Sequence, residues 1–104
     1  MALNSVVSEG TIISGSVVRN CVVGRNVRIH SYSQIEDSVI MDWVEIGRGC
    51  KIRHAIIDKS NIIPAGTEIG YDLEKDRQRY FVSETGVVVL ARGERRANWS
   101  LIPP

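Results

Sequence analysis

The sequence has few aromatic residues, no long apolar run and no excess of charge of either sign. Phe, Trp and Tyr make up 6% of the 104 residues, and 13 Lys and Arg stand against 12 Asp and Glu, for a formal net charge of +1. Nucleic-acid affinity comes mainly from clustered positive charge, so no nucleic-acid partner is expected. No apolar run approaches the roughly 20 residues that span a bilayer, so no membrane partner is expected either.

Two further absences concern the compartment. Residues Met1 to Asn4 contain neither a basic segment nor an apolar one, so no secretory signal is predicted. Cys21 and Cys50 are the only cysteines, too few for a disulfide framework. The chain is 43% hydrophobic and 24% charged, which is typical of a globular protein with a single core. We therefore expect one domain in a reducing, cytoplasmic protein.

What the sequence does contain is a regular series of aliphatic residues, spaced five or six positions apart. The series is Val7, Ile13, Val18, Val23, Ile29, Ile35, Ile40, Ile46, Ile52, Ile57, Ile63 and Ile69. The residue two positions before each is small or slender and lies on the same face of a strand. This slender series is Ser5, Thr11, Ser16, Cys21, Val27, Ser33, Ser38, Val44, Cys50, Ala55, Asn61 and Thr67. No helix has this period, and the Asn-Gly and Asp-Gly turns of hairpins are absent, so the pattern indicates a hexapeptide repeat.

Three hexads close one turn of a triangular prism. From Val23 onward the spacings repeat every 17 residues, which stacks Val23, Ile40 and Ile57 on one face. The sequence therefore predicts an all-β fold, a parallel β-helix of about four coils over residues 1–70. Periodicity does not give the hand, but hexapeptide repeats are known for left-handed β-helices, against the usual right-handed crossover rule. Gly24, Gly47 and Gly70 are expected at corners that need a positive φ.

The pattern stops at Gly70, and residues 71–104 are predicted to complete the same domain. Residues 71–81 are charged and helix-permissive, with Asp72 as the N-cap, and would form a short capping helix. One extra strand is predicted over residues 87–90, followed by an irregular tail. At the other end the repeat begins abruptly after Asn4. Another domain or subunit is expected to cover that end, with a plug of terminal residues as the alternative.

Few residues suit catalysis or metal binding. His30 and His54 cannot supply a three-histidine zinc site, and both are expected at solvated corners. A hexapeptide acyltransferase would use one of them as a general base. Cys21 and Cys50 belong to the slender series and are expected to be buried structural thiols. No P-loop, phosphate cradle or pair of catalytic carboxylates is present, so no catalytic residue, cofactor or metal site is predicted.

Basic residues are more suggestive. Lys59 lies two residues after Ile57, and Arg92, Arg95 and Arg96 follow the last predicted strand. A phosphate needs two or more such donors converging on it. From spacing alone, a solvated surface is the alternative.

Several segments match one family in order along the chain. They are residues 3–15 (LNSVVSEGTIISG), 44–50 (VEIGRGC), 55–59 (AIIDK), 62–70 (IIPAGTEIG), 74–79 and 86–89. Together they resemble the C-terminal left-handed β-helix domain of bacterial ADP-glucose pyrophosphorylase (glucose-1-phosphate adenylyltransferase) over about residues 3–92. The N-terminal nucleotidyltransferase domain of that family is absent from this chain.

The resemblance implies a parent enzyme that joins ATP and glucose 1-phosphate into ADP-glucose and pyrophosphate, with Mg²⁺, for glycogen biosynthesis. Its β-helix domain helps to hold a homo-oligomer and forms part of an effector pocket, whose basic residues match Lys59, Arg92 and Arg96 here. The chain would then be a regulatory and oligomerisation domain, inactive alone. Its partners would be the nucleotidyltransferase domain and an anionic sugar-phosphate or nucleotide effector. The alternatives are a trimeric hexapeptide acyltransferase and a purely structural assembly module.

Overall fold

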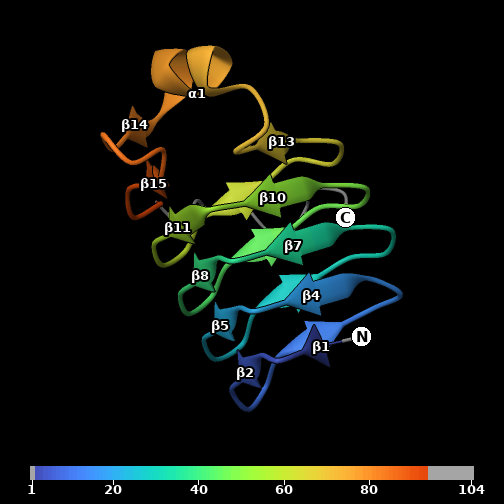
Figure 1. The fold of residues 1–104 in the computed structure, drawn as a ribbon. Helices are drawn as coiled ribbons and strands as arrows, with labels where there is room; N and C mark the ends of the chain where they lie inside the picture. Colours follow the sequence, from blue (N-terminus) through green and yellow to red (C-terminus); the bar gives the residue numbers. More distant parts are fainter. Residues whose placement is uncertain (1, 94–104) are drawn as a thin grey trace.

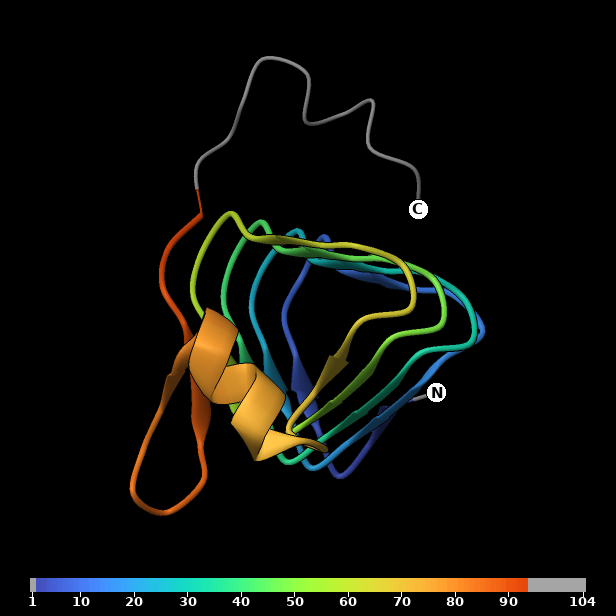
Figure 2. The ribbon, with the colours of Figure 1, turned by 90° about the horizontal axis from the view of Figure 1, so that it is seen from above.

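The computed structural model describes residues 2–93. Residues 2–69 wind into stacked coils (Figure 1), which are triangular in outline when seen from above (Figure 2). Strands β1 to β13 follow one another around the prism, joined by corners of one to four residues. Their bounds are β1 Ala2–Leu3, β2 Val6–Val7, β3 Ile12–Ile13, β4 Val17–Arg19, β5 Val22–Val23, β6 Arg28–Ile29, β7 Gln34–Glu36, β8 Val39–Ile40, β9 Glu45–Ile46, β10 Lys51–Arg53, β11 Ala55–Ile57, β12 Ile62–Ile63 and β13 Glu68–Ile69. Helix α1 (Leu73–Arg79) and strands β14 (Phe81–Val82) and β15 (Val88–Leu90) follow.

Strands one coil apart pair in parallel and build one sheet on each side of the prism. Sheet A has the order β1-β4-β7-β10-β13, sheet B β14-β15-β11-β8-β5-β2, and sheet C β12-β9-β6-β3. Ile35 lies opposite Ile52, 17 residues on, whereas Val7 in the first coil lies opposite Val23, 16 residues on. The predicted register is confirmed. Seen from above, the chain turns clockwise as it rises toward the viewer, so the β-helix is left-handed (Figure 2).

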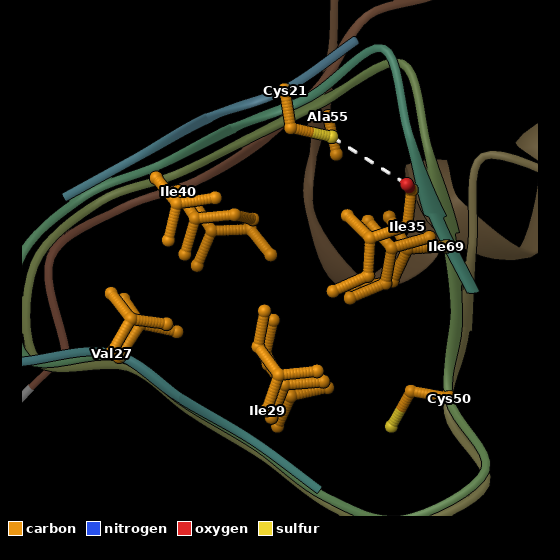
Figure 3. Close-up of a cluster of buried hydrophobic side chains, with 14 of the residues drawn as sticks. Cys21, Val27, Ile29, Ile35, Ile40, Cys50, Ala55 and Ile69 are labelled. Carbon is orange, nitrogen blue, oxygen red and sulfur yellow. Dashed lines mark hydrogen bonds between the residues drawn. The ribbon is translucent and has the colours of Figure 1, made fainter. Parts of the chain in front are cut away.

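The aliphatic series fills the inside of the prism, where isoleucines stack from coil to coil (Figure 3). Its members from Val18 to Ile69 are all buried, with relative exposures of 0 to 4%. Burying one such side chain contributes about 1.5–3 kcal/mol. Val7 is 36% exposed and Ile13 half-buried, because no coil lies beneath the first one. The N-terminal end of the apolar interior is therefore open within the described chain.

The slender series does more than leave room for the isoleucines. Ser33 Oγ donates to the carbonyl of Gly47 at 2.9 Å and accepts the N–H of Cys50 at 3.1 Å. Cys21 Sγ likewise donates to the carbonyl of Ile35 at 3.5 Å, the dashed line in Figure 3. At the bends between sheets, these side chains supply hydrogen bonds to backbone N–H and C=O groups that have no strand partner. The hydroxyl and thiol residues thus join successive coils.

The corner glycines differ in part from the prediction. Gly70 has the expected positive φ of +87°, but Gly24 and Gly47 do not have a positive φ. A Cβ at Gly47 would lie 2.5 Å from the backbone N of Ala65, so the close approach of the next coil is what requires glycine there. Left-handed corners are instead occupied by several residues with side chains, among them Trp43 at φ +62°.

Helix α1 lies over part of the C-terminal end of the prism, on the side next to the β14–β15 hairpin (Figure 2). Asp72 is its N-cap, as predicted, and accepts the N–H of Lys75 at 3.3 Å. The carboxylate of Asp76 is buried and accepts the N–H of Gly70 at 2.9 Å, which fixes the helix to the last coil. The helix ends at Arg79, earlier than predicted, because Tyr80 is extended and hydrogen-bonded back to Asp76.

Two strands follow the helix, not the single one predicted. Phe81 was assigned to the helix but lies in β14, which pairs antiparallel with β15. β15 in turn pairs parallel with β11, so the hairpin extends sheet B beyond the last coil.

Candidate functional site

The return of β15 to the prism brings two predicted site residues, Lys59 and Arg92, to one corner. β15 pairs with β11 so that Leu90 lies opposite Ile57. Just beyond, the N–H of Gly93 donates to the carbonyl of Lys59 at 2.9 Å. Lys59 and Arg92 are thus neighbours on adjacent layers, whose backbones are about 4.8 Å apart, and both are exposed. Arg96, the third predicted residue, lies outside the described residues.

Two uncharged residues hold this corner together. Asn61 Nδ2 donates to the carbonyls of Asp58 at 2.9 Å and Ala91 at 2.8 Å, which ties the Lys59 segment to the Arg92 segment. A Cβ on Gly93 would lie 2.4 Å from the carbonyl oxygen of Ser60, so only glycine lets the two backbones approach this closely. Sequence reasoning missed the role of Asn61. The available signal was that Asn61 is the one amide in the slender series.

The charges at this corner follow a pattern along the prism. Equivalent corner positions in successive layers carry Glu9, Arg25, Asp42, Lys59 and Arg92, as the backbone ladder of hydrogen bonds shows. The sign alternates until the last step, and Arg25 pairs with Asp42 at 3.6 Å.

In the last two layers of this corner, the cations Lys59 and Arg92 occupy neighbouring positions. Within residues 2–93 neither the Lys59 nor the Arg92 side chain forms an ion pair. Adjacent like charges are unfavourable, and an anion held by both side chains would offset their repulsion.

A hollow of about 490 Å³ opens beside the corner, between α1 and the β14–β15 hairpin. Asn61 and Ala91 line it next to the cation pair, and Arg79, Tyr80 and Phe81 line it farther away. Neither Lys59 nor Arg92 lines this hollow, which meets their corner only through Asn61 and Ala91.

The two histidines lie apart from this corner. His30 Nε2 is 3.0 Å from a carboxylate oxygen of Glu45, and its side chain is 19% exposed, so the prediction of a solvated corner is wrong for His30. His54 is 59% exposed and lies 3.5 Å from Asp37, as expected of a corner residue.

The thiols and carboxylates do not form a metal site within the described residues. Burial raises the pKa of the Cys21 and Cys50 thiols, and both side chains are buried and unbridged, so the prediction of structural thiols is confirmed. Across residues 2–93 no group of three or more His, Cys, Asp or Glu is placed to hold a metal ion. In that same range no helix is long and apolar enough to cross a membrane.

Comparison with known proteins places the chain among hexapeptide proteins. A family model described as "GlmU-like, C-terminal hexapeptide" matches residues 1–90. A glucose-1-phosphate adenylyltransferase of Alteromonas mediterranea is 58% identical over 92 residues, covering 88% of this chain and 21% of that protein. Proteins of the same name from Anaeromyxobacter sp. and Rhodopirellula baltica are each 54% identical, covering 90% and 93% of this chain and 23% and 22% of their own lengths. The chain spans less than a quarter of the curated relatives it matches, and these matches bear out the resemblance seen in the sequence.

Proposed function

The chain belongs to the GlmU-like, C-terminal hexapeptide family, and from this premise we propose that it is the regulatory and oligomerisation domain of a glucose-1-phosphate adenylyltransferase. The whole enzyme would make ADP-glucose and pyrophosphate from ATP and glucose 1-phosphate, for glycogen biosynthesis in the cytoplasm. This chain alone would be inactive, since the nucleotidyltransferase domain and its Mg²⁺ would lie in the part outside it. The high identity to relatives of that name over nearly the whole chain supports the proposal.

The regulatory role rests on one observation, the step at which Lys59 and Arg92 break the alternation of charge at their corner. Two exposed cations on adjacent layers suit the phosphate of a sugar phosphate or nucleotide, which accepts charge-assisted hydrogen bonds from both. A corner is convex, so the remaining walls of the pocket would come from the nucleotidyltransferase domain. An effector bound across the two parts would shift that domain between states with a coupling of about 1–3 kcal/mol.

The oligomerisation role is supported by the open first coil. Ala2 and Val7 are exposed although their partners one coil higher, Val18 and Val23, are fully buried. The lower edges of β1, β2 and β3 also have no partner strand within residues 2–93. Contact with another part of the enzyme, either another subunit or the preceding domain, would cover both the apolar interior and these edges.

Substitution of the two cations in the full-length enzyme tests the regulatory role. Lys59→Ala and Arg92→Ala are each expected to raise the half-saturating concentration of a phosphorylated activator about tenfold or more, with the rate without activator nearly unchanged, because charge-assisted hydrogen bonds to the activator are lost. The exposed Lys51→Ala on sheet A is the matched control, with an unchanged response. If Lys59→Ala and Arg92→Ala respond like the parent, the domain is a purely structural assembly module.

A further inference from the structure

The outer side of sheet B carries an unbroken row of apolar side chains. Val6, Val22, Val39, Ile56 and Val89 lie opposite one another in successive strands, and Phe81 of β14 continues the row next to Val89. Val6, Val22 and Phe81 are 64%, 51% and 67% exposed. Val39, Ile56 and Val89 are half-buried. We call these six residues the apolar row; they run along the whole side of the prism that Figure 1 shows from β2 to β14.

The other two sides of the prism have no such row. The equivalent outward positions of sheet A are Val17, Gln34, Lys51 and Glu68. Those of sheet C are Ile12, Arg28, Glu45 and Ile62, so charged residues break the apolar pattern there. Outward side chains add nothing to the core of the prism, and sheet A forms with polar residues at most of these positions. An all-apolar row on one side alone therefore indicates a covered surface.

Polar residues flank the apolar row on both sides. At one corner Asn20 donates to Asp37 at 3.2 Å, and His54 lies 3.5 Å from the same carboxylate. At the other corner stand the alternating charges that end in Lys59 and Arg92. An apolar centre with polar margins is the usual anatomy of a protein interface.

We propose that the apolar row is the surface against which the preceding nucleotidyltransferase domain of the same polypeptide packs, an inference that rests on the proposed function. The relatives are more than four times as long as the part that this chain matches, so a large body is available to cover it. The cation pair stands at the margin of the row. A domain seated on sheet B therefore borders Lys59 and Arg92, where its share of the effector pocket is needed.

The same corner also borders sheet C, so the outer side of sheet C is the alternative surface against which the nucleotidyltransferase domain could pack. Arg28 and Glu45 occupy the middle of its outer side, and desolvating these charges on packing would be unfavourable. Sheet B loses only apolar surface on packing, which is favourable at about 25 cal/mol per Å². The chemistry of the two sides therefore selects sheet B.

Thiol accessibility in the full-length enzyme tests the proposal. Val22→Cys on the apolar row and Gln34→Cys on the outer side of sheet A are compared for their rates of reaction with a maleimide. The native Cys21 and Cys50 are buried and give little background. Val22→Cys is expected to react about tenfold or more slowly than Gln34→Cys, because labelling then requires the domains to separate. Equal rates overturn the proposal.

A second variant tests whether the nucleotidyltransferase domain is what shields Val22→Cys from the maleimide. Val39→Glu adds a charge to the middle of the row and is expected to restore fast labelling of Val22→Cys, whereas Gln34→Glu leaves the protection intact. Protection that disappears on dilution into a monomeric enzyme identifies a second copy as the occupant and also overturns the proposal. An enzyme that makes ADP-glucose and responds to effector while Val22→Cys labels freely refutes this inference alone. Loss of the effector response in every preparation would instead tell against the proposed function.

Discussion

At the scale of single residues, the position two before each aliphatic residue is occupied by a hydroxyl, a thiol, a small apolar group or, once, an amide. In the middle coils the hydroxyls and thiols bond to the coil above, as Ser33 bonds to Gly47. At Asn61 no further coil follows on that side, and its longer amide reaches Asp58 and Ala91 instead. Asn61 thus stands where the repeat ends, and its side chain joins the segments that carry Lys59 and Arg92.

Asn61→Ala is expected to lower the free energy of unfolding by about 1–3 kcal/mol, because the carbonyls of Asp58 and Ala91 lose their donor. In the full-length enzyme it is also expected to weaken activation by loosening Arg92 from Lys59, with the unactivated rate retained. Urea titration and activator titration measure the two effects. Gln34→Ala on the exposed outer side of sheet A is the control. A variant as stable and as responsive as the parent would show that the two hydrogen bonds do not position the corner.

The buried thiols predict a pH dependence of stability. Burial raises the pKa of Cys21 and Cys50 above the ordinary value of 9.0, so the folded state keeps its thiol protons when the unfolded chain has lost them. At alkaline pH the unfolded state therefore binds fewer protons, and the free energy of unfolding falls as pH rises through the unfolded pKa toward the folded one.

Replacement of both cysteines by serine isolates this effect, since serine already occupies equivalent positions such as Ser38 and Ser33. Urea titrations at about pH 8 and pH 10 should show a larger loss of stability for the parent than for the double variant. Equal losses would mean that other groups, such as Tyr71, whose pKa burial also raises, account for the whole dependence.

At the scale of the elements, very short strands hold together because each is paired above and below and stacked inside. Ile46 in β9 has 0% exposure and lies between Ile29 and Ile63 in sheet C. β9 contributes only two residues to its sheet, so the inward side chain carries most of its packing.

Ile46→Ala is expected to lower the free energy of unfolding by about 2–5 kcal/mol, through lost burial and the cavity left behind. The outward and exposed Lys51→Ala should change it by less than about 0.5 kcal/mol. Glu45 is unsuitable as the outward control because it contacts His30. Denaturant titrations compare the two, and similar losses would place the register one residue out.

At the scale of the whole molecule, the prism is closed at one end and open at the other. α1 and its buried Asp76 cover part of the C-terminal end. At the N-terminal end the inward residues Ala2 and Val7 are exposed, and the edges of the first coil are unpaired, within the described chain.

The isolated chain of 104 residues is accordingly expected to self-associate. Sedimentation should show an oligomer that dissociates on dilution, and Val7→Lys should shift it toward the monomer by placing a charge at the open end. Gln34→Lys on sheet A serves as the control for added charge. A monomer at every accessible concentration contradicts the prediction.

The repeat made much of this architecture predictable. Inward and outward residues alternate within each hexad, so a slip of one residue would bury Arg28 or Lys51, and only one register is compatible with the pattern. The β-helix was predicted from residue 1, but the aliphatic series omits its first inward residue, since Ala2 already pairs with Val18. β14 was missed because Phe81 continues the charged, helix-permissive segment without a breaker.

The sequence by itself determined the coils, their register, the inward face and the family, because in a β-helix each strand pairs with the strand about one coil away and the same short pattern recurs at that interval. Tertiary structure alone decided that Lys59 meets Arg92, that Asn61 ties them together and that Val89 and Phe81 extend the apolar row of sheet B. Those features depend on where the β14–β15 hairpin returns to β11, a pairing beyond the repeat that no local period encodes. The physical reason is that local periodicity specifies which face of a strand is buried, whereas contacts made after the repeat ends depend on the packing of α1 and the hydrogen bonds that close the corner.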